Sequence, residues 1–585
     1  MALTLMDKGA SAYRIVVGAE ADAGTRYAAG ELAKYLGQIG GVQLAVVDDA
    51  AVPQEKEIVI GKTNREGGPC GAGLKNDGYI LKTVGERLFI LGQNDRGNLY
   101  GVYGLLENKL GCRFFTASLE RVPAMETVEL PCLDETVIPP LEYRLTSWNE
   151  VSHNPVYAYK RGTNNLPGTP VTPMLNHSLC HTLFRYLSPE EYFDTHPEYF
   201  SMVNGVRIRE ETQLCLTNPE VKEIVKRNLR KTILEHPECT IFSVSQMDWY
   251  NPCQCPECAR VDAEEGSHMG TMLRFVNECA DFVAEEFPHV IIETLAYQYT
   301  RQAPKITRPR PNVCICLCTI ECCFTHPMRQ CHEAVRPFKY ITDPDHPIQQ
   351  DLVDWGKICK RLLVWDYTTN YRFYLAPMIN LHVIQDNVKF FIENGVSQLF
   401  EQGNGQSISG EFGELRAYLL TKLMWEPDGD LSAWMDEFLD AYYGAGGRAI
   451  RAYIDLLADH VTRHHVHAGI YESPMDVIPN TLLPKMTELW DEAARLTQDD
   501  PEASAHVDRS RLQLEFVKHH RRRPHEVDFA EKAEELIASI QRNKVTYVQE
   551  IFESNQPQPE ALERSFTQIR KGNLPDTWPV FWQPF

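Results

Sequence analysis

One repeated pattern between residues 143 and 425 constrains the fold of this chain most strongly. A short apolar run ends in polar or aromatic residues and is followed by a stretch with helical spacing. The runs are "YRLTSW", "MLNHSLC", "QLCLT", "TIFSVSQMD", "VIIETLAY", "NVCICLCTIE", "RLLVWDY" and "SQLFEQG". Eight strands that alternate with helices predict a (β/α)8 TIM barrel, in which functional residues lie where the strands end.

The regions that flank this pattern predict two further domains in an α/β protein. Residues 1–135 combine short apolar runs such as "YRIVVG" and "EIVIG" with two helical stretches, which indicates an α/β sandwich-like accessory domain. The proline-marked "LPCLDETVIPPLEYR" ends it, so the barrel is predicted at 136–428. Helical periodicity dominates residues 429–585 and predicts a helical C-terminal domain.

Charge and composition exclude several classes of partner. The net charge is −22 and no long basic block occurs, so neither nucleic acid nor an anionic membrane surface is an expected partner. No signal peptide is recognisable, and no run approaches ~18 uninterrupted apolar residues. The 17 cysteines are scattered and several lie in strand-like runs, which indicates reduced, buried thiols. We therefore expect a soluble, cytoplasmic protein.

Carboxylates recur where the predicted strands end. Asp248, Glu321, Asp366 and Glu401 close the fourth, sixth, seventh and eighth strands. Glycoside hydrolysis needs two such groups, because one carboxylic acid protonates the leaving oxygen while a second carboxylate attacks, activates water or orients a neighbouring group. These four residues are the predicted catalytic acids. Taken singly, each can equally cap a loop or pair with an arginine.

Aromatic and amide side chains at the same rim are suited to sugar binding. Flat rings can pack on sugar faces, and amides can bond hydroxyl groups. The predicted substrate-binding residues are Trp148, His181, Gln246, Trp249, Tyr297, Trp365, Tyr367 and Asn370. Because side chains alternate along a strand, the rings at 365 and 367 point away from Asp366, and one of them can belong to the core.

Several segments resemble a known bacterial family along nearly the whole chain. They include "CHTLFRYLSPEEYFDTHPEYFSMVNGVR", "QLCLTNPE", "VSQMDW" followed by "CQCPEC", "VWDYTTNY", "ENGVSQLFEQG" and "GEFGELRAYLLTKLMWEPDGD". The family is domain of unknown function 4838, part of which is glycoside hydrolase family 163, with endo-β-N-acetylglucosaminidase activity on complex N-glycans. The N-terminal unit resembles the accessory domain of family 67 α-glucuronidases and family 20 β-hexosaminidases.

The resemblance implies hydrolysis at the barrel mouth, with the 2-acetamido group of the substrate as a candidate nucleophile. Related hexosaminidase barrels place two adjacent acids at the end of strand four, whereas this chain has Gln246 and Asp248 there. The second acid would then come from Glu321, Asp366 or Glu401. Asp248 and Glu321 are the preferred pair, with Glu401 next, and their individual roles stay open.

Two groups of metal-type residues admit more than one interpretation. Cys253, Cys255 and Cys258 have a spacing compatible with a structural zinc ion, for which His268 is a candidate fourth ligand. We favour cysteines that shape the loop after Asp248, and predict no metal or cofactor. In "DHVTRHHVHAGIYES", the histidines at 460 and 464 share one helical face, either as a metal pair or, more commonly, as a solvated surface. A third interpretation has this segment reach over the barrel mouth and contact the substrate.

These observations predict a glycoside hydrolase acting on an oligosaccharide that contains an N-acetylhexosamine. A cytoplasmic location favours short imported oligosaccharides cut from an end. The alternatives are an exo-acting glycosidase for another sugar such as a uronide, a non-catalytic carbohydrate-binding protein, and, more weakly, a metal-dependent hydrolase.

Overall fold

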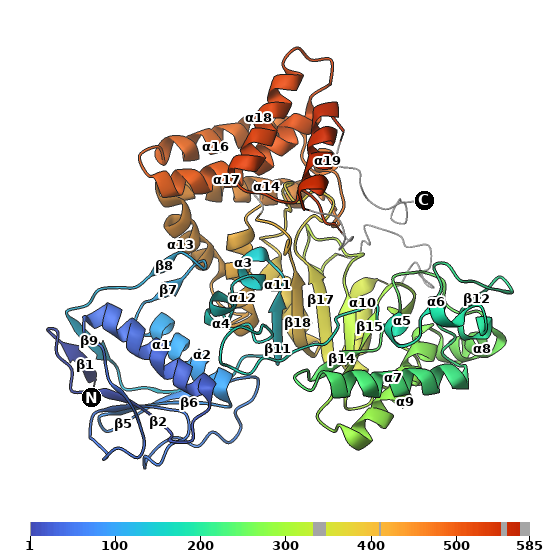
Figure 1. Ribbon diagram of the computed structural model, residues 1–585. Coiled ribbons are helices and arrows are strands. Elements are labelled where there is room, and N and C mark those ends of the chain that lie inside the picture. Colours follow the sequence, from blue (N-terminus) through green and yellow to red (C-terminus); the bar gives the residue numbers. More distant parts are fainter. Residues whose placement is uncertain (1, 332–346, 409–410, 552–557, 574–585) are drawn as a thin grey trace.

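The computed structural model describes residues 2–331, 347–408, 411–551 and 558–573. An N-terminal α/β domain, a central barrel and a C-terminal helical domain follow one another along the chain (Figure 1). The α/β class predicted from the sequence is confirmed, including the curled parallel sheet at the centre.

A six-stranded mixed sheet forms the centre of the N-terminal domain, in the order β10-β5-β6-β4-β2-β3. Its strands are β2 (Arg14–Val17), β3 (Val46–Asp48), β4 (Glu57–Ile60), β5 (Tyr79–Val84), β6 (Arg87–Gly92) and β10 (Asp134–Val137). The β5–β6 hairpin turns at Gly85, whose φ of 61° suits glycine. Four shorter strands accompany the sheet: β1 (Leu3–Asp7), β7 (Arg113–Phe114), β8 (Glu120–Arg121) and β9 (Thr127–Leu130).

Helices α1 (Ala23–Gly40) and α2 (Asp95–Asn108) pack side by side on this sheet (Figure 1). Asp22 caps the start of α1 by accepting a hydrogen bond from the backbone N–H of Thr25. Gly41 ends the same helix with a φ of 74°, as expected for a glycine just beyond a helix. The apolar sides of both helices and the sheet enclose a core of their own.

The barrel contains a sheet of six parallel strands in the order β11-β18-β17-β16-β15-β14. The strands are β11 (Tyr143–Thr146), β14 (Ile241–Ser243), β15 (Ile291–Ala296), β16 (Val313–Cys318), β17 (Leu362–Tyr367) and β18 (Val396–Gln402). Every residue of "VCICLC" in β16 is buried, as expected for a parallel strand covered on both faces. These strands correspond to six of the eight predicted runs.

The other two runs do not form full barrel strands. The "MLNHSLC" run contributes one parallel bridge, from Asn176 to Ile241, and so lies beside β14. The "QLCLT" run instead makes an antiparallel bridge between Leu214 and Phe200. Its Gln213 side chain donates to the carbonyls of residues 247 and 249. This run therefore supports the loop after β14 rather than joining the sheet.

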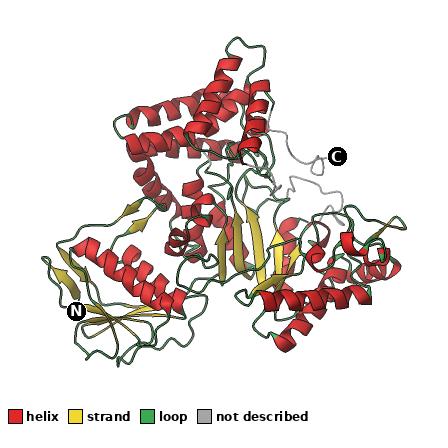
Figure 2. Ribbon diagram, viewed as in Figure 1, coloured by secondary structure: helices red, strands yellow, loops and turns green. Residues whose placement is uncertain are grey.

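Helices surround the barrel sheet and connect its strands (Figure 2). They are α3 (Asn149–Ser152), α4 (Pro155–Lys160), α5 (Leu183–Tyr186), α6 (Pro189–Tyr192), α7 (Pro219–Glu235), α8 (Pro256–Glu265), α9 (Met269–Glu286), α10 (Ile348–Ile358), α11 (Ile384–Glu393) and α12 (Gly413–Trp425). A two-stranded ribbon, β12 (Met202–Val203) and β13 (Val206–Arg207), precedes α7.

Helix α7 shows why these segments are helical. Asn218 caps its N-terminus, and Pro219 occupies the first turn, where no backbone donor is needed. Its buried residues recur every fourth position and form one apolar stripe: Val221, Val225, Leu229 and Ile233. Each buried aliphatic side chain contributes about 1.5–3 kcal/mol to stability.

Helices and the loops between them make up the described residues of the C-terminal domain (Figure 2). Its helices are α13 (Leu431–Tyr443), α14 (Gly447–His464), α15 (Pro474–Val477), α16 (Leu483–Leu496), α17 (Pro501–Arg521), α18 (Phe529–Arg542) and α19 (Gln558–Lys571). Two connections of this domain, 465–473 and 543–551, contact the barrel. Among the described residues, no helix is both long and apolar enough to cross a membrane.

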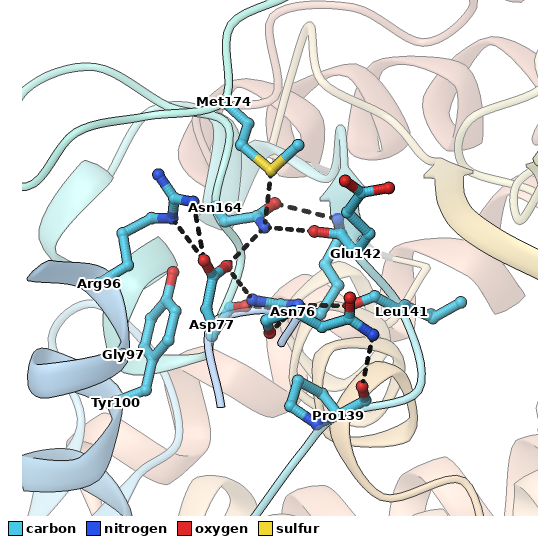
Figure 3. Close-up of polar contacts among 12 residues, drawn as sticks. Asn76, Asp77, Arg96, Gly97, Tyr100, Pro139, Leu141, Glu142, Asn164 and Met174 are labelled. Atoms are coloured by element: carbon cyan, nitrogen blue, oxygen red, sulfur yellow. Dashed lines mark hydrogen bonds and ion pairs between the residues drawn. The ribbon is translucent and has the colours of Figure 1, made fainter. Parts of the chain in front are cut away.

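A buried carboxylate joins the N-terminal domain to the barrel (Figure 3). Asp77, in the loop before β5, accepts hydrogen bonds from Arg96 of its own domain at 2.7 and 3.0 Å. From the barrel, Arg144 of β11 and the Asn164 amide each reach its second oxygen at 2.8 Å. Burial opposes the charge on Asp77, but the two arginines outweigh it and lower the pKa of this carboxyl group.

Candidate active site at the barrel mouth

The inner face of the barrel is identified by a contact between strands that are not neighbours. The Cys314 thiol of β16 lies 3.5 Å from the Gln398 amide oxygen of β18, although β17 runs between them. Such a contact is possible only on the concave side of the sheet. Because side chains alternate along a strand, Gln402 shares this inner face with Gln398, whereas Glu401 points the other way.

The same argument separates the predicted residues of β17. Trp365 and Tyr367 are the register partners of Phe400 and Gln402, so both rings belong to the inner face. Their ring centroids lie 6.1 Å apart. Asp366 is the partner of Glu401 and lies with it on the outer face.

Asp366 and Glu401 form a buried acid pair behind the sheet. They are 4 % and 1 % exposed, and Asp366 accepts a hydrogen bond from Thr319 at 2.5 Å. Burial raises the pKa of Asp366 to about 6. Burial and the neighbouring Asp366 raise the pKa of Glu401 well above its usual value. The structure thus brings these predicted acids together, but on the side of the strands that faces away from the barrel axis.

Asp248 lies in the loop after β14, at the mouth. Its Oδ1 accepts hydrogen bonds from the Tyr297 hydroxyl at 3.1 Å and from the Gln298 amide at 3.3 Å. The side chain stays partly exposed. Gln298 and the nearby His181 are non-glycine residues with φ angles of 52° and 53°. Such left-handed conformations are costly and tend to occur at functional sites.

A second mouth carboxyl comes from Glu550, in the C-terminal domain, which the sequence did not reveal. Its backbone N–H donates to the carbonyl of Tyr371 at 2.8 Å. The Gln402 amide donates to its Oε1 at 3.4 Å, and the Trp365 indole N–H donates to Gln402 at 2.7 Å. Glu550 is thereby tied to the inner face at the ends of β17 and β18.

The environment of Glu550 favours its protonated form. Burial, followed by the negative charge of Asp248, raises the pKa of Glu550 to about 8. The charge of Asp248, on the β14 loop, therefore reaches Glu550, which is tied to β17 and β18, at the mouth. At neutral pH the site contains a proton donor beside a second carboxyl group.

Residues 466–472 also reach the barrel mouth, as one interpretation of the histidine-rich segment predicted. The carbonyl of Ile470 accepts from the backbone of Tyr371 at 3.0 Å, and that of Ala468 from Phe324 at 2.8 Å. The Tyr471 ring lies 6.4 Å from the Tyr371 ring. The contact with the barrel is established, whereas contact with a substrate stays a prediction.

Glu321, one of the two preferred acids, is paired with a cation. It is 1 % exposed, and its Oε1 lies 3.5 Å from Nη1 of Arg301. Arg301 also contacts Asp351 of α10 at 2.5 Å. Burial raises the pKa of Glu321 in spite of the nearby Arg301. Glu321 thus lies in a buried cluster with Arg301 and Asp351, in line with the structural alternative considered for each carboxylate.

Three of the predicted sugar-binding side chains instead form hydrogen bonds within the protein. Trp148 is 1 % exposed, and its indole N–H donates to Thr368 at 3.0 Å. The Gln246 amide donates to the Tyr297 carbonyl, and its oxygen accepts from Thr300. The Asn370 amide donates to a carbonyl at residue 472 and accepts from the backbone at 373. These side chains position loops, because their polar atoms already have partners.

The other predicted ligands lie at the mouth itself. His181, Trp249 and Trp365 are partly exposed, and Tyr297 and Tyr367 are buried beneath them at 5 % and 7 %. The His181 ring bonds through Nδ1 to the Gln246 carbonyl at 2.8 Å.

The cysteines after Asp248 gather with a fourth cysteine that is distant in sequence. Cys215 lies 3.6 Å from Cys255 and 3.9 Å from Cys258, sulphur to sulphur. His268, the candidate fourth ligand of a zinc site, instead contacts Asp262 at 2.6 Å. Cys215 belongs to the "QLCLT" run. Because this run lies outside the barrel sheet, Cys215 can approach the cysteines after Asp248, which the sequence spacing does not reveal.

His460 and His464 lie together on α14, with ring centroids 4.9 Å apart. Among the described residues, they belong to no group of three or more metal-type side chains. This geometry agrees with a solvated histidine face.

One protein-family model matches more than half of the chain. The family model for domain of unknown function 4838 matches residues 114–455, more than half of the sequence. The chain belongs to this family. A second model, glycosyl hydrolase family 67 N-terminus, matches residues 5–105. The comparison with curated proteins yields no match.

Solved structures resemble the chain in fold at low identity. A family 115 4-O-methyl-α-glucuronidase with specificity for decorated arabinogalactans is 11 % identical, with a TM-score of 0.56, over 99 % of this chain and 80 % of that one. A chitobiase from Flavobacterium johnsoniae is 10 % identical, with a TM-score of 0.45, over 93 % and 92 %. The first match shows that the two proteins share a fold. Together with the family 67 match, it supports the predicted enzyme class.

Proposed function

We propose that this protein is a glycoside hydrolase that cleaves an oligosaccharide at an N-acetylhexosamine, with Glu550 as proton donor and Asp248 as the second carboxylate. The observation that carries the proposal is that hydrogen bonds hold both groups at the mouth, where the charge of Asp248 helps to raise the pKa of Glu550. A proton-donating carboxyl group with a second carboxyl group at the same site is what acid-assisted glycoside cleavage requires.

The chemistry follows from this arrangement. Glu550 gives its proton to the leaving glycosidic oxygen as the bond to the anomeric carbon breaks. Asp248 stabilises the positive charge that develops on the sugar, either directly or by holding the acetamido N–H while the acetamido oxygen attacks. Water then completes hydrolysis and a proton returns to Glu550. Tyr297 and Gln298 fix the orientation of Asp248 by donating to its Oδ1.

The charge at the mouth favours a neutral sugar over a uronide. The carboxylate of Asp248 would repel the carboxylate of a uronic acid. Arg301, the cation nearest to Glu321, is already paired with Asp351. An N-acetylhexosamine has no charge to accommodate, and the tyrosine and tryptophan rings of the inner face offer it apolar surface.

A uronide-specific, exo-acting glycosidase is the second candidate, because the N-terminal domain matches the family 67 model. A carbohydrate-binding protein without turnover is the third. The proposal also includes a cytoplasmic location with short imported oligosaccharides as substrates, which the 17 free cysteines support.

Leaving-group dependence tests the proposal directly. The parent, Glu550→Gln and Asp248→Asn would be assayed on aryl β-N-acetylhexosaminides, other aryl glycosides, aryl uronides and N-glycan fragments. We expect turnover of the N-acetyl substrates. Glu550→Gln should lose activity on poor leaving groups and keep it on strongly activated aryl groups, which need no protonation. Asp248→Asn should lose both.

Glu57→Gln is the matched control, since it makes the same substitution at a buried carboxylate in the N-terminal domain, beside Arg14 and Arg65. Its folded fraction should retain parental turnover. Turnover of uronides alone would favour the second candidate. Sugar binding that survives both mouth substitutions, without any turnover by the parent, would replace the proposal with a binding function.

A further inference from the structure

We propose that Cys215, Cys253, Cys255 and Cys258 bind a structural zinc ion that fixes the loop carrying Asp248. The ligand atoms of the four cysteines all lie within 4.8 Å of one another. The four residues are between 1 % and 7 % exposed. They enclose one small buried volume between the loop after β14, the start of α8 and the "QLCLT" run.

The sulphur separations fit a tetrahedral zinc site. With zinc–sulphur bonds of about 2.3 Å, sulphur atoms at the corners of a tetrahedron are about 3.8 Å apart. The separations from Cys215 to Cys255 and Cys258 are 3.6 and 3.9 Å. A disulfide would require about 2.05 Å. The spacing thus fits four thiolates around one cation better than two oxidised pairs.

Hydrogen-bond donors lie close to the sulphur atoms, as is usual for metal-bound thiolates. The backbone N–H at residue 202 lies 3.4 Å from the Cys253 sulphur, and Arg207 Nη1 lies 3.5 Å from it. The Thr217 hydroxyl lies 3.2 Å from the Cys258 sulphur. Hydrogen bonds of this kind stabilise the negative charge of thiolate ligands and orient them.

The site is structural because cysteines occupy all four positions of the tetrahedron and leave none for water or substrate. Its role follows from the segments it joins. Cys253 is five residues beyond Asp248, and Gln213, two residues before Cys215, holds the carbonyls of residues 247 and 249. A metal ion bound here would connect the segment that follows Asp248 to the "QLCLT" run, which holds the Asp248 loop through Gln213. The inference is independent of the proposed reaction.

A second cluster carries the same inference independently. Cys323, His326, Cys331 and His467 also place one ligand atom each within 4.8 Å of the others. Nδ1 of His326 lies 3.3 Å from the Cys323 sulphur, and Nδ1 of His467 lies 3.4 Å from the Cys331 sulphur. Two cysteines and two histidines are a common ligand set for structural zinc.

This second site would connect the loop after β16 to the C-terminal domain. His467 lies in the 466–472 segment, which contacts the barrel mouth through the carbonyls of Ala468 and Ile470. The ligands come from positions 136 residues apart in sequence, Cys331 and His467. A zinc ion here would hold the segment that carries Tyr471 against the barrel.

Metal analysis of the full chain tests both sites. The untagged protein, purified without chelators, should contain about two zinc ions per chain by elemental analysis. Cys258→Ser and His467→Ala should each remove about one ion, and together both. Cys279→Ser is the matched control, because Cys279 is a buried, free cysteine on α9 outside both clusters and should leave the metal content unchanged.

A second substitution at Cys215 distinguishes the loss of a zinc ligand from a failure of the variant to fold. Cys215→His keeps a zinc-competent ligand, so it should restore the zinc that Cys215→Ser loses. Cobalt exchanged into the zinc sites should give the strong visible absorption of tetrahedral cobalt–thiolate, weakened by Cys258→Ser. Absence of zinc from the folded parent, with either free or disulfide-bonded thiols after denaturation, would overturn the inference. Zinc content unaffected by the ligand substitutions would do the same.

Discussion

Asp77 at the domain junction is buried, whereas Glu550 at the barrel mouth is partly exposed, and the charged neighbours of the two carboxyl groups differ. Arg96 and Arg144 contact Asp77 and lower its pKa. Glu550 has Asp248 as its charged neighbour, and its pKa rises to about 8. Burial raises both pKa values, so the partner decides the outcome. The junction carboxylate holds two domains together, whereas the mouth carboxyl keeps a proton that chemistry can use.

The largest expected effect is on stability at the junction. Asp77→Asn leaves the guanidinium of Arg144, which is fully buried, without its charge partner. Loss of one member of a buried ion pair costs about 3–5 kcal/mol in unfolding free energy. Denaturant unfolding followed by tryptophan fluorescence measures it. A loss below about 1 kcal/mol would show that the junction carboxylate is no more important than an exposed one.

Unlike Asp77→Asn, Glu550→Gln should cause little loss of stability and a large loss of activity. Removal of a general acid lowers kcat/KM on a poor leaving group by about 10²–10⁴-fold. In the parent, kcat/KM should fall as pH rises through about 8, because Glu550 loses its proton. A pH–rate profile of parent and variant tests this. An unchanged alkaline limb in the variant would assign that proton to another group.

The pH dependence of stability should have opposite signs in the two regions. The folded pKa of Asp77 is lowered, so its contribution is present above the unfolded value of about 3.9 and lost as pH falls further. The folded pKa of Glu550 is raised, so its contribution is present below about 4.3 and lost as pH rises. Between pH 4 and 8, Glu550→Gln should therefore gain stability relative to the parent, on the order of a few kcal/mol. Unfolding curves at several pH values measure the difference.

The smallest expected effect concerns the outer-face acid pair. Glu401→Gln should lower kcat/KM by less than about fivefold, because a side chain on the outer face acts on the mouth only through the strand. Steady-state kinetics beside Glu550→Gln provide the comparison. A loss as large as that of Glu550→Gln, in a variant of parental stability, would return Glu401 to the catalytic role that the sequence predicts.

Local patterns predicted much of the fold. The strand at 313–318, the hairpin turn at Gly85 and the helix end at Gly41 follow from burial periodicity and from the conformational freedom of glycine. The short runs around residues 176 and 214 were wrongly predicted to be full barrel strands. Their length is similar to that of a strand, but their hydrogen bonds depend on which neighbour they meet.

The candidate site was predicted only in part. Asp248 and the rings at 297, 365 and 367 were found because strand ends in a barrel converge. The replacement of Glu321, and of Glu401 after it, by Glu550 as candidate acid depends on the contact between Glu321 and Arg301, on which face of β18 points inward and on where a distant segment docks. Cys215 and Cys253 illustrate the same limit, since 38 residues separate their positions in the sequence.

By itself, the sequence determined the central parallel sheet with its flanking α/β and helical regions, the aromatic residues at the mouth and the place of Asp248, because each depends on periodicity within a few residues. Only the tertiary structure decided which carboxyl groups face the barrel interior, which are neutralised by arginines and which cysteines meet. Those outcomes depend on charges and ligands brought together from separate segments, and electrostatic and metal-binding energies are set by such distances in space rather than by spacing in sequence.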